Sequence, residues 1–367
     1  MSTEIPVRSL SAAAYVIPTD GPEADGTLAW DSTTLVVVHA EAGDQTGTGW
    51  TYSTPAAVPL VSGMLAAVVA GRDALDVPPV TEAMYRAVRN LGGCGIAAMA
   101  ISAADIALWD LKARLLDSSL VSLLGRPGPV PVYGSGGFTS YDSRQLADQL
   151  TGWVHDLGIP RVKIKIGESW GSNEARDLAR IQEARTVIGA DTELFVDANG
   201  GYTAPQAAQV AAKMADYAVT WFEEPVSSDD LAGLASLRTQ IEPDVTAGEY
   251  SWNLQDSARL LSARAVDCLQ IDVTRCGGIT GFRQAAELAS AHGLQVSGHC
   301  APNLHAHAAA GIANLRHVEY FHDHQRIEDL LFDGALPAAG GVLNPDPDVP
   351  GLGLRLRSAA AEQYRAA

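Results

Sequence analysis

The chain has 367 residues, 47% of them hydrophobic and 19% charged, and these values are typical of a folded protein rather than a disordered one. Its length exceeds that of one ordinary domain and favours a large domain with a smaller companion. The formal net charge is -18 and Lys and Arg form no cluster along the sequence, which excludes an extended nucleic-acid-binding surface.

Residues 1–125 differ in pattern from the rest of the chain. The segment TTLVVVHAEAGDQTGTGWTYS, residues 33–53, has the alternation and the central turn of a β-hairpin. The segment AAMAISAADIALWDLKARLL, residues 97–116, has the apolar period of an amphipathic helix. We therefore expect a separate N-terminal α+β domain.

Residues 126–326 alternate short apolar, β-branched runs with longer segments of helical period, as repeated βα units do. Eight runs recurring every ~25 to 30 residues fit a closed (β/α)8 barrel better than an open sheet, which often carries a Gly-rich dinucleotide turn. No such turn is present in the sequence. The runs begin at Val130, Val162, Glu193, Thr220, Val245, Cys268, Leu294 and His317. The fold class is therefore α/β, with a TIM-like barrel.

Residues 327–367 are too few for a further domain and contain the turn-rich sequence NPDPDVPGLG. We expect them to return to the N-terminal part and complete that capping domain.

The four cysteines show no CxxC spacing and are too few to cross-link a chain of this length, so reduced thiols and a cytoplasmic location are expected. The start, MSTEIPVRSL, lacks a charged end followed by an apolar run, and no segment is long enough to span a bilayer. A membrane partner is therefore not expected.

Three acidic residues follow three successive strands at equal intervals. Asp197, Glu223 and Glu249 are each 26 residues apart, which is one βα unit. Active sites of this fold lie at the strands' carboxyl ends, so these side chains should converge. Converging carboxylates need a cation to stay ionised, and an all-oxygen set favours Mg2+ over zinc. The alternative is that each one only caps the next helix.

Two neighbours of this trio are interpreted differently. Asn199, two residues after Asp197, should lie on the same side and hydrogen-bond the substrate, although a turn-forming role before Gly200 fits as well. Glu224 is adjacent to Glu223, so strand alternation predicts that it points elsewhere.

The second strand carries Lys163 and Lys165 at alternate positions, hence on one face. Ammonium groups held close repel each other, and partial desolvation adds to this, so the pKa of at least one should fall. We expect Lys165, nearer the strand's carboxyl end, to be the catalytic base and Lys163 to help hold a substrate carboxylate. The alternative is two solvated lysines on an edge strand.

The sixth and seventh strands end near Asp272 and His299. A carboxylate beside a histidine fixes its tautomer and raises its basicity, so the pair can give or take a proton. A histidine that only satisfies core neighbours is the alternative. Glu319, on the eighth strand, would donate a hydrogen bond to a substrate carboxylate if protonated, and a plain ion-paired Glu is its alternative.

Together these residues resemble the enolase superfamily, specifically mandelate racemase/muconate lactonizing enzyme-like proteins of its mandelate racemase subgroup. The motifs occur in order over nearly the whole chain: Lys163-x-Lys165, Asp197-Ala198-Asn199, Phe222-Glu223-Glu224-Pro225, Gly248-Glu249, Ile271-Asp272, Gly298-His299, Glu319, the helix segment 107–111 and Pro350-Gly351-Leu352-Gly353.

The resemblance implies a modified (β/α)7β barrel whose capping domain is built from both chain ends. It implies one Mg2+ held by Asp197, Glu223 and Glu249. It also implies that Lys165 and the Asp272–His299 pair flank the substrate on opposite faces. A Lys or His base acting with magnesium on an enediolate is the known chemistry of this superfamily.

The function implied is removal of the proton alpha to the carboxylate of a small-molecule substrate, with Mg2+, Lys163 and Glu319 stabilising the enediolate. We expect dehydration of a sugar acid to a 2-keto-3-deoxy acid, in which His299 protonates the departing β-hydroxyl. Racemisation or epimerisation of a 2-hydroxy acid uses the same residues and stays open. A homo-oligomer is the default for such enzymes.

Two rivals come from other classes. A catalytically silent, metabolite-binding barrel is disfavoured because every expected ionisable group is present. A Schiff-base aldolase using either lysine would not need three carboxylates at equal intervals. Substrate identity is expected to lie in the segment 43–52, where Trp50 and Tyr52 either cover the substrate or pack in the core.

Overall fold

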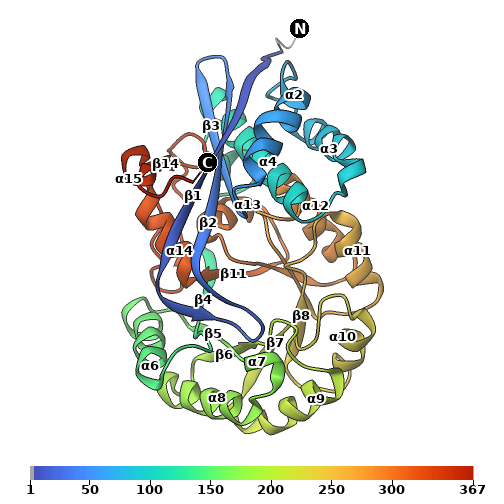
Figure 1. Ribbon diagram of the computed structural model, residues 1–367, viewed down its shortest axis with the longest axis vertical. Coiled ribbons are helices and arrows are strands. Elements are labelled where there is room, and N and C mark those ends of the chain that lie inside the picture. Colours follow the sequence, from blue (N-terminus) through green and yellow to red (C-terminus); the bar gives the residue numbers. More distant parts are fainter. Residues whose placement is uncertain (1–3, 367) are drawn as a thin grey trace.

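Eight parallel strands close into a barrel in the computed structural model, which describes residues 4–366 (Figure 1). Each strand pairs with its neighbour in chain order, and the last pairs with the first. They are β4 (Val130–Gly136), β5 (Arg161–Lys165), β6 (Glu193–Asp197), β7 (Val219–Glu223), β8 (Asp244–Ala247), β9 (Cys268–Ile271), β10 (Gln295–Gly298) and β11 (Leu315–Phe321). All eight predicted strands are confirmed.

Helices surround the barrel and cover the outer faces of the strands (Figure 1). They are α6 (Ser143–Thr151) with η3 (Gly152–Asp156), α8 (Glu174–Ile188), α9 (Ala204–Lys213) with η4 (Ala215–Tyr217), α10 (Leu231–Leu237), α11 (Leu254–Ser262), α12 (Gly278–Ala291), α13 (Pro302–Ala308) and α14 (His322–Leu331). The short α7 (Glu168–Gly171) lies at the barrel mouth after β5. None of the helices within residues 4–366 is both long enough and apolar enough to cross a bilayer.

Strand alternation separates the two faces of each barrel strand. Val162 and Ile164 of β5 are fully buried in the main apolar core between strands and helices, so Lys163 faces the barrel interior. Below Lys163 a small aromatic cluster, which includes Phe195 and Trp221, fills the barrel. The rings of these two stack with centroids 5.3 Å apart. The charged side chain of Lys163 therefore packs against an aromatic cluster inside the barrel.

The N-terminal part is an antiparallel sheet backed by helices. The sheet has the order β1 (Val7–Ala24), β2 (Ala29–Ala42), β3 (Gln45–Tyr52). The helices are α1 (Ala57–Pro59), η1 (Leu60–Leu65), α2 (Ala66–Val69), α3 (Val77–Ala87), η2 (Arg89–Leu91), α4 (Ile96–Leu115) and α5 (Leu120–Leu124). The predicted hairpin is confirmed as β2–β3, and the predicted helix is confirmed as α4. Its expected amphipathic character is wrong, because residues 100–108 are all buried and α4 is therefore enclosed on every face over this stretch.

Two glycines of β3 let this sheet approach α4 closely. A Cβ on Gly47 would lie 2.2 Å from the carbonyl oxygen of Ala107, and one on Gly49 would lie 2.4 Å from that of Ala103. Only the absence of a side chain permits this contact.

The connection between β1 and β2 reaches the mouth of the barrel (Figure 1). A Cβ on Gly26 would lie 2.6 Å from the carbonyl oxygen of Ile166 and 2.8 Å from that of Ala198, just beyond β5 and β6. The backbone N–H of Trp170 donates to the carbonyl of Gly26 at 2.9 Å. The loop at the mouth is thus residues 25–28, whereas the segment 43–52, in which substrate selection was expected, is mostly strand β3.

The C-terminal segment joins the barrel to the cap. It contains β12 (Phe332–Asp333), β13 (Val342–Leu343), β14 (Arg355–Leu356) and α15 (Ser358–Glu362). β13 pairs with β4 of the barrel, and the backbone N–H of Val16 in β1 donates to the carbonyl of Tyr364 at 2.8 Å. Division of the chain at residues 125 and 326 stays a prediction.

One buried carboxylate links three parts of the capping domain. Asp110 of α4 accepts hydrogen bonds from the backbone N–H groups of Thr48 in β3, at 2.7 Å, and of Leu352, at 2.6 Å. Arg114, one turn further along the helix, donates to the same carboxylate at 2.9 Å. The motifs at 107–111 and 350–353 therefore meet in space.

Candidate active site

Three carboxylates from neighbouring strands meet at the barrel mouth. Asp197 is the last residue of β6 and Glu223 the last of β7, and the two lie opposite each other in the sheet. Glu249 lies two residues beyond β8. All three are buried, and carboxylate oxygens of Glu223 and Glu249 lie within 4.8 Å of a ring nitrogen of His299. The structure thus brings the equally spaced carboxylates together.

Both lysines of β5 point into this group of carboxylates. The ammonium nitrogen of Lys163 lies 2.6 Å from Glu223 Oε2 and 2.7 Å from Glu319 Oε1. The ammonium nitrogen of Lys165 lies 2.5 Å from Asp197 Oδ2. The two lysines share one face of the strand, as its alternation predicts, and they are not solvated.

The pKa of both lysines differs from the sequence-based expectation. Burial and the neighbouring Lys163 lower the pKa of Lys165, but Asp197, Glu223 and Glu319 together outweigh them, so the pKa is raised. Burial also opposes the charged form of Lys163, yet Glu223 and other carboxylates raise its pKa well above the ordinary value. The predicted lowering is wrong for this arrangement because attraction by the carboxylates exceeds repulsion between the ammonium groups.

Acidic side chains outnumber permanently cationic side chains within the site. Six buried carboxylates gather there, from Asp197, Glu223, Glu224, Glu249, Asp272 and Glu319. Three permanently cationic side chains oppose them, from Lys163, Lys165 and Arg275. Burial and the charge of Asp197 raise the pKa of Glu223 to about 8, which reflects this imbalance. A divalent cation would offset the repulsion.

Unpaired oxygens provide donors for such an ion. Glu249 Oε2, Glu224 Oε1 and Asn199 Oδ1 are buried and make no hydrogen bond to any group within residues 4–366. The backbone N–H of Asn199 donates a hydrogen bond to Asp197 Oδ1 at 2.8 Å, so Asn199 itself belongs to the site. Oxygen is the donor that Mg2+ prefers. Charge and donor type therefore both suit Mg2+, with Asp197, Glu223 and Glu249 as the residues that would hold it.

Asp272 and His299 form a hydrogen-bonded pair at the ends of β9 and β10. Asp272 Oδ2 lies 2.9 Å from His299 Nδ1. Burial lowers the pKa of His299, but Glu249, Glu319 and the bonded Asp272 raise it overall. Arg275 contacts both acidic partners, with Nε 3.4 Å from Asp272 Oδ2 and Nη1 3.2 Å from Glu249 Oε1. The predicted pair is present, and Arg275 fixes its position relative to the carboxylates.

Glu319 of β11 is paired with a lysine and a backbone N–H group. Its Oε1 pairs with Lys163 at 2.7 Å, and its Oε2 accepts a hydrogen bond from the backbone N–H of Cys300 at 2.9 Å. Burial opposes the charged form, but Lys163 and His299 lower the pKa of Glu319 well below its ordinary value. The ion-paired alternative therefore describes Glu319 in this arrangement, and a hydrogen bond from a protonated Glu319 to a substrate carboxylate stays a prediction.

Two residues of the cluster are missed by strand alternation. Glu224 is buried, and burial together with the charges of Glu249 and Asp197 raises its pKa well above the ordinary value. The prediction that it points away is wrong because its φ is 36°, which ends the alternation after Glu223. Cys300 has a φ of 54° and places its thiol sulfur 3.3 Å from His299 Nε2. No sequence pattern marks either backbone conformation.

The two aromatic residues of β3 pack against the C-terminal part of the chain. Trp50 is fully buried and stacks on Phe332 with ring centroids 4.5 Å apart. Tyr52 stacks on the ring of His324, with centroids 3.3 Å apart, and lies closer to the site because His324 Nδ1 accepts from the backbone N–H that follows Cys300. A role for either in substrate binding stays a prediction.

Two family profiles match the chain. The profile described as "Mandelate racemase / muconate lactonizing enzyme, N-terminal domain" matches residues 21–125. The profile described as "Enolase C-terminal domain-like" matches residues 145–360, which is more than half of the chain.

Individual relatives match over nearly the full length. D-galactarolactone cycloisomerase of Agrobacterium fabrum is 31% identical over 94% of this chain and 95% of its own. The crystal structure of a mandelate racemase/muconate lactonizing enzyme-like protein from Rubrobacter xylanophilus superposes with a TM-score of 0.94 at 49% identity, covering 98% of this chain and 99% of that one. The crystal structure of L-talarate/galactarate dehydratase from Salmonella typhimurium LT2, liganded with Mg and L-lyxarohydroxamate, superposes with a TM-score of 0.88 at 26% identity. The match covers 100% of this chain and 94% of that one.

Proposed function

Because the chain belongs to the mandelate racemase/muconate lactonizing enzyme family of the enolase superfamily, we propose that it is a Mg2+-dependent dehydratase of a sugar acid. It removes the proton alpha to the substrate carboxylate and releases a 2-keto-3-deoxy acid. One observation carries the proposal of acid and base catalysis from two sides, and the activities of relatives favour dehydration. The Asp272–His299 pair and Lys165 flank the same group of carboxylates from strands that are not neighbours, so a base and an acid face one substrate.

Lys165 serves as the base that takes the alpha proton. It must be unprotonated to do so, and Lys163 next to it lowers its pKa, whereas Asp197 raises it. A carboxylate that shares its charge with a bound cation raises the pKa of its neighbour less. Bound Mg2+ would supply positive charge beside the substrate carboxylate and so stabilise the enediolate. Lys163, held in place by Glu223 and Glu319, adds a second fixed positive charge.

His299 serves as the acid that protonates the departing β-hydroxyl. Its Nδ1 is engaged by Asp272, so Nε2 is the atom that faces the site and carries the transferable proton. The raised pKa of His299 favours the imidazolium form that this step requires, because the surrounding carboxylates outweigh burial. The proton leaves with the hydroxyl as water, and tautomerisation of the resulting enol gives the keto acid.

Two named activities of relatives support a sugar-acid substrate. The Salmonella protein is a dehydratase of talarate and galactarate, and the Agrobacterium protein is a cycloisomerase of a galactarolactone. Dehydration is favoured here because His299, whose pKa is raised by the surrounding carboxylates, lies opposite the base. Cycloisomerisation of a lactone is the second candidate, since the match to the cycloisomerase extends over 94% of this chain.

The test is alpha-proton exchange in D2O. The protein, with Mg2+, is incubated with a panel of sugar acids and their lactones, and with small 2-hydroxy acids, and the alpha proton is followed by NMR. We expect loss of that proton and a new 2-keto acid methylene signal, both abolished by EDTA. Ring opening or closure of a lactone without water loss would identify a cycloisomerase, and inversion at the alpha carbon would identify a racemase.

Two lysine variants locate the base. Lys165→Ala should lower the exchange rate by about 10²- to 10⁴-fold, the usual contribution of a positioned base. Lys213→Ala is the matched control, because Lys213 lies on α9 in an exposed ion pair with Glu174. Equal activity of the two variants would rule out Lys165 as the base, and absence of exchange with every compound would favour a silent, metabolite-binding barrel.

Assembly into a homo-oligomer and a cytoplasmic location are further expectations for this protein. Size-exclusion chromatography with light scattering measures the first directly.

A further inference from the structure

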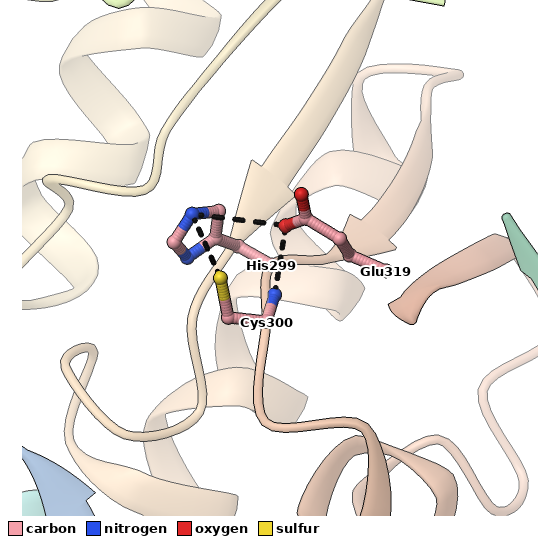
Figure 2. Close-up of side chains that lie close together, drawn as sticks. All are labelled: His299, Cys300 and Glu319. Carbon is pink, nitrogen blue, oxygen red and sulfur yellow. Dashed lines mark hydrogen bonds and ion pairs between the residues drawn. The ribbon is translucent and has the colours of Figure 1, made fainter. Parts of the chain in front are cut away.

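Three side chains of different chemistry converge at the ends of β10 and β11. Figure 2 shows the ring of His299, the thiol of Cys300 and the carboxylate of Glu319 pointing toward one another. His299 Nε2 lies 3.3 Å from Cys300 Sγ and 3.7 Å from Glu319 Oε2. One donor atom from each residue lies within 4.8 Å of the other two, and all three residues are buried.

These separations are close to those between ligands of a tetrahedral zinc ion. With metal–ligand distances of ~2.3 Å for sulfur and ~2.1 Å for nitrogen and oxygen, tetrahedral geometry places nitrogen about 3.6 Å from sulfur and about 3.4 Å from oxygen. The two distances from His299 Nε2, 3.3 Å to sulfur and 3.7 Å to oxygen, each differ from these values by about 0.3 Å, so small side-chain adjustments would complete the geometry. Sulfur, nitrogen and oxygen together suit zinc, whereas Mg2+ avoids sulfur.

The histidine is already oriented as a metal ligand. Asp272 binds Nδ1 at 2.9 Å, so the lone pair of neutral His299 is on Nε2, which faces the sulfur. A carboxylate behind a histidine is the usual support for zinc-bound imidazole. Glu249 Oε2 also lies 3.3 Å from this nitrogen, but that oxygen belongs to the carboxylate set assigned to Mg2+, so His299, Cys300 and Glu319 are the donors specific to the second site.

We propose that His299, Cys300 and Glu319 form a second metal site, which binds zinc or a similar thiophilic divalent ion and inhibits the enzyme. The ion displaces the thiol proton of Cys300, and that of His299 when it is protonated, to solvent, and bonds form from sulfur, nitrogen and oxygen to the metal. Zinc at His299 Nε2 occupies the atom that protonates the leaving hydroxyl. Binding is independent of the proposed dehydration, whereas inhibition rests on it.

The selectivity of the two sites follows from their donors. Asp197, Glu223 and Glu249 offer only oxygen and lie toward β6, β7 and β8, whereas the thiol of Cys300 lies on the side of β10. A hard ion therefore prefers the first set and a thiophilic ion the second. The barrel mouth would thus distinguish an activating ion from an inhibiting one.

Binding is tested with Co2+ as a spectroscopic probe, in the presence of saturating Mg2+. A thiolate bound to cobalt gives a charge-transfer band in the near ultraviolet, and we expect this band to saturate at one equivalent and to be displaced by Zn2+. Cys300→Ser should abolish the band and weaken zinc binding by about 100-fold or more, measured by competition with a chromophoric chelator. Asp272→Asn should weaken it by about 10- to 100-fold, because the support of the imidazole is lost.

Cys94→Ser is the matched control, because Cys94 is an exposed thiol outside the site and should not affect the band. Cys300→Ala provides a second variant, and circular dichroism of both confirms that they are folded. Zinc affinity that is unchanged in Cys300→Ser but lost in Glu223→Gln would overturn the proposal, because the ion would then occupy the Glu223, Glu249 and His299 group. No substrate enters this measurement, so it stands whether or not the dehydratase proposal does.

Discussion

His299 Nδ1 lies 2.9 Å from Asp272 Oδ2, although the two residues belong to different βα units 27 positions apart. The contact holds the imidazole in one tautomer and adds to the charges of Glu249 and Glu319, which together raise the pKa of His299 against the effect of burial. The side chain is therefore prepared to act as an acid, and its partners determine over which pH range it can do so.

Replacing Asp272 should change both rate and pH dependence. We expect Asp272→Asn to lower kcat by about 10²- to 10⁴-fold, as loss of a positioned acid does. An acid group loses activity as pH rises through its pKa, and Asp272 raises the pKa of His299, so the variant should lose activity at a lower pH than the wild type. The pH profile of kcat measures both. Asp148→Asn, in an exposed pair with Arg144, is the control, and an unshifted profile would contradict the role of Asp272.

Magnesium should stabilise the fold, because it offsets repulsion among buried carboxylates. At a free concentration near 100 times Kd the gain is about 2.7 kcal/mol, which corresponds to a rise in Tm of a few degrees. Glu249→Gln should greatly reduce this rise. Without the ion, the Tm of the Glu249→Gln variant should be no lower than that of the wild type, because the charge of Glu249 disfavours ionised Glu224. Calorimetry with and without EDTA measures both effects, and Glu242→Gln, on an exposed residue, should behave as wild type.

Gly26 should matter for catalysis more than its exposed neighbours in the same hairpin. A methyl group at this position would meet three carbonyl oxygens at 2.6 to 2.9 Å, so Gly26→Ala should lift the 25–28 loop from the mouth. We expect kcat/KM to fall at least about tenfold, since misplacement of a substrate-covering loop by 1 Å costs up to 10²-fold. Gly21→Ala is the control, because a methyl group there meets nothing within 4 Å. A normal kcat/KM for Gly26→Ala would mean that the loop does not close the site.

Trp50 should affect stability. Its fully buried ring stacks on Phe332, so Trp50→Ala should lower the free energy of unfolding by about 3 to 5 kcal/mol. Denaturant unfolding measures this loss, and KM of the folded fraction should stay near the wild-type value. A raised KM with little loss of stability would instead support the sequence-based prediction that Trp50 contacts the substrate.

Regular geometry explains which features could be predicted from the sequence. Equal spacing of Asp197, Glu223 and Glu249 identifies one strand end per βα unit, and strand alternation places Lys163 and Lys165 on one face. Both patterns repeat with the period of the fold, so the sequence alone reveals them.

The failures arise where that regularity ends. Glu224 and Cys300 have positive φ, so alternation no longer indicates their direction. The pKa of Lys165 depends on the distance to Asp197, a tertiary contact that strand patterns do not contain. The loop at the barrel mouth, residues 25–28, is short and polar like many turns, and only its contact with the ends of β5 and β6 distinguishes it.

The pairing of β1 with residues 364–366 has a consequence for folding during synthesis. The backbone N–H of Val16 donates to the carbonyl of Tyr364, and that of Ala366 donates to the carbonyl of Ala14, both at 2.8 Å. The ribosome synthesises β1 before the whole barrel and these partners only after it. The β1 edge of the N-terminal sheet therefore remains unpaired while the barrel is synthesised. During that time the edge can pair with strands of other chains.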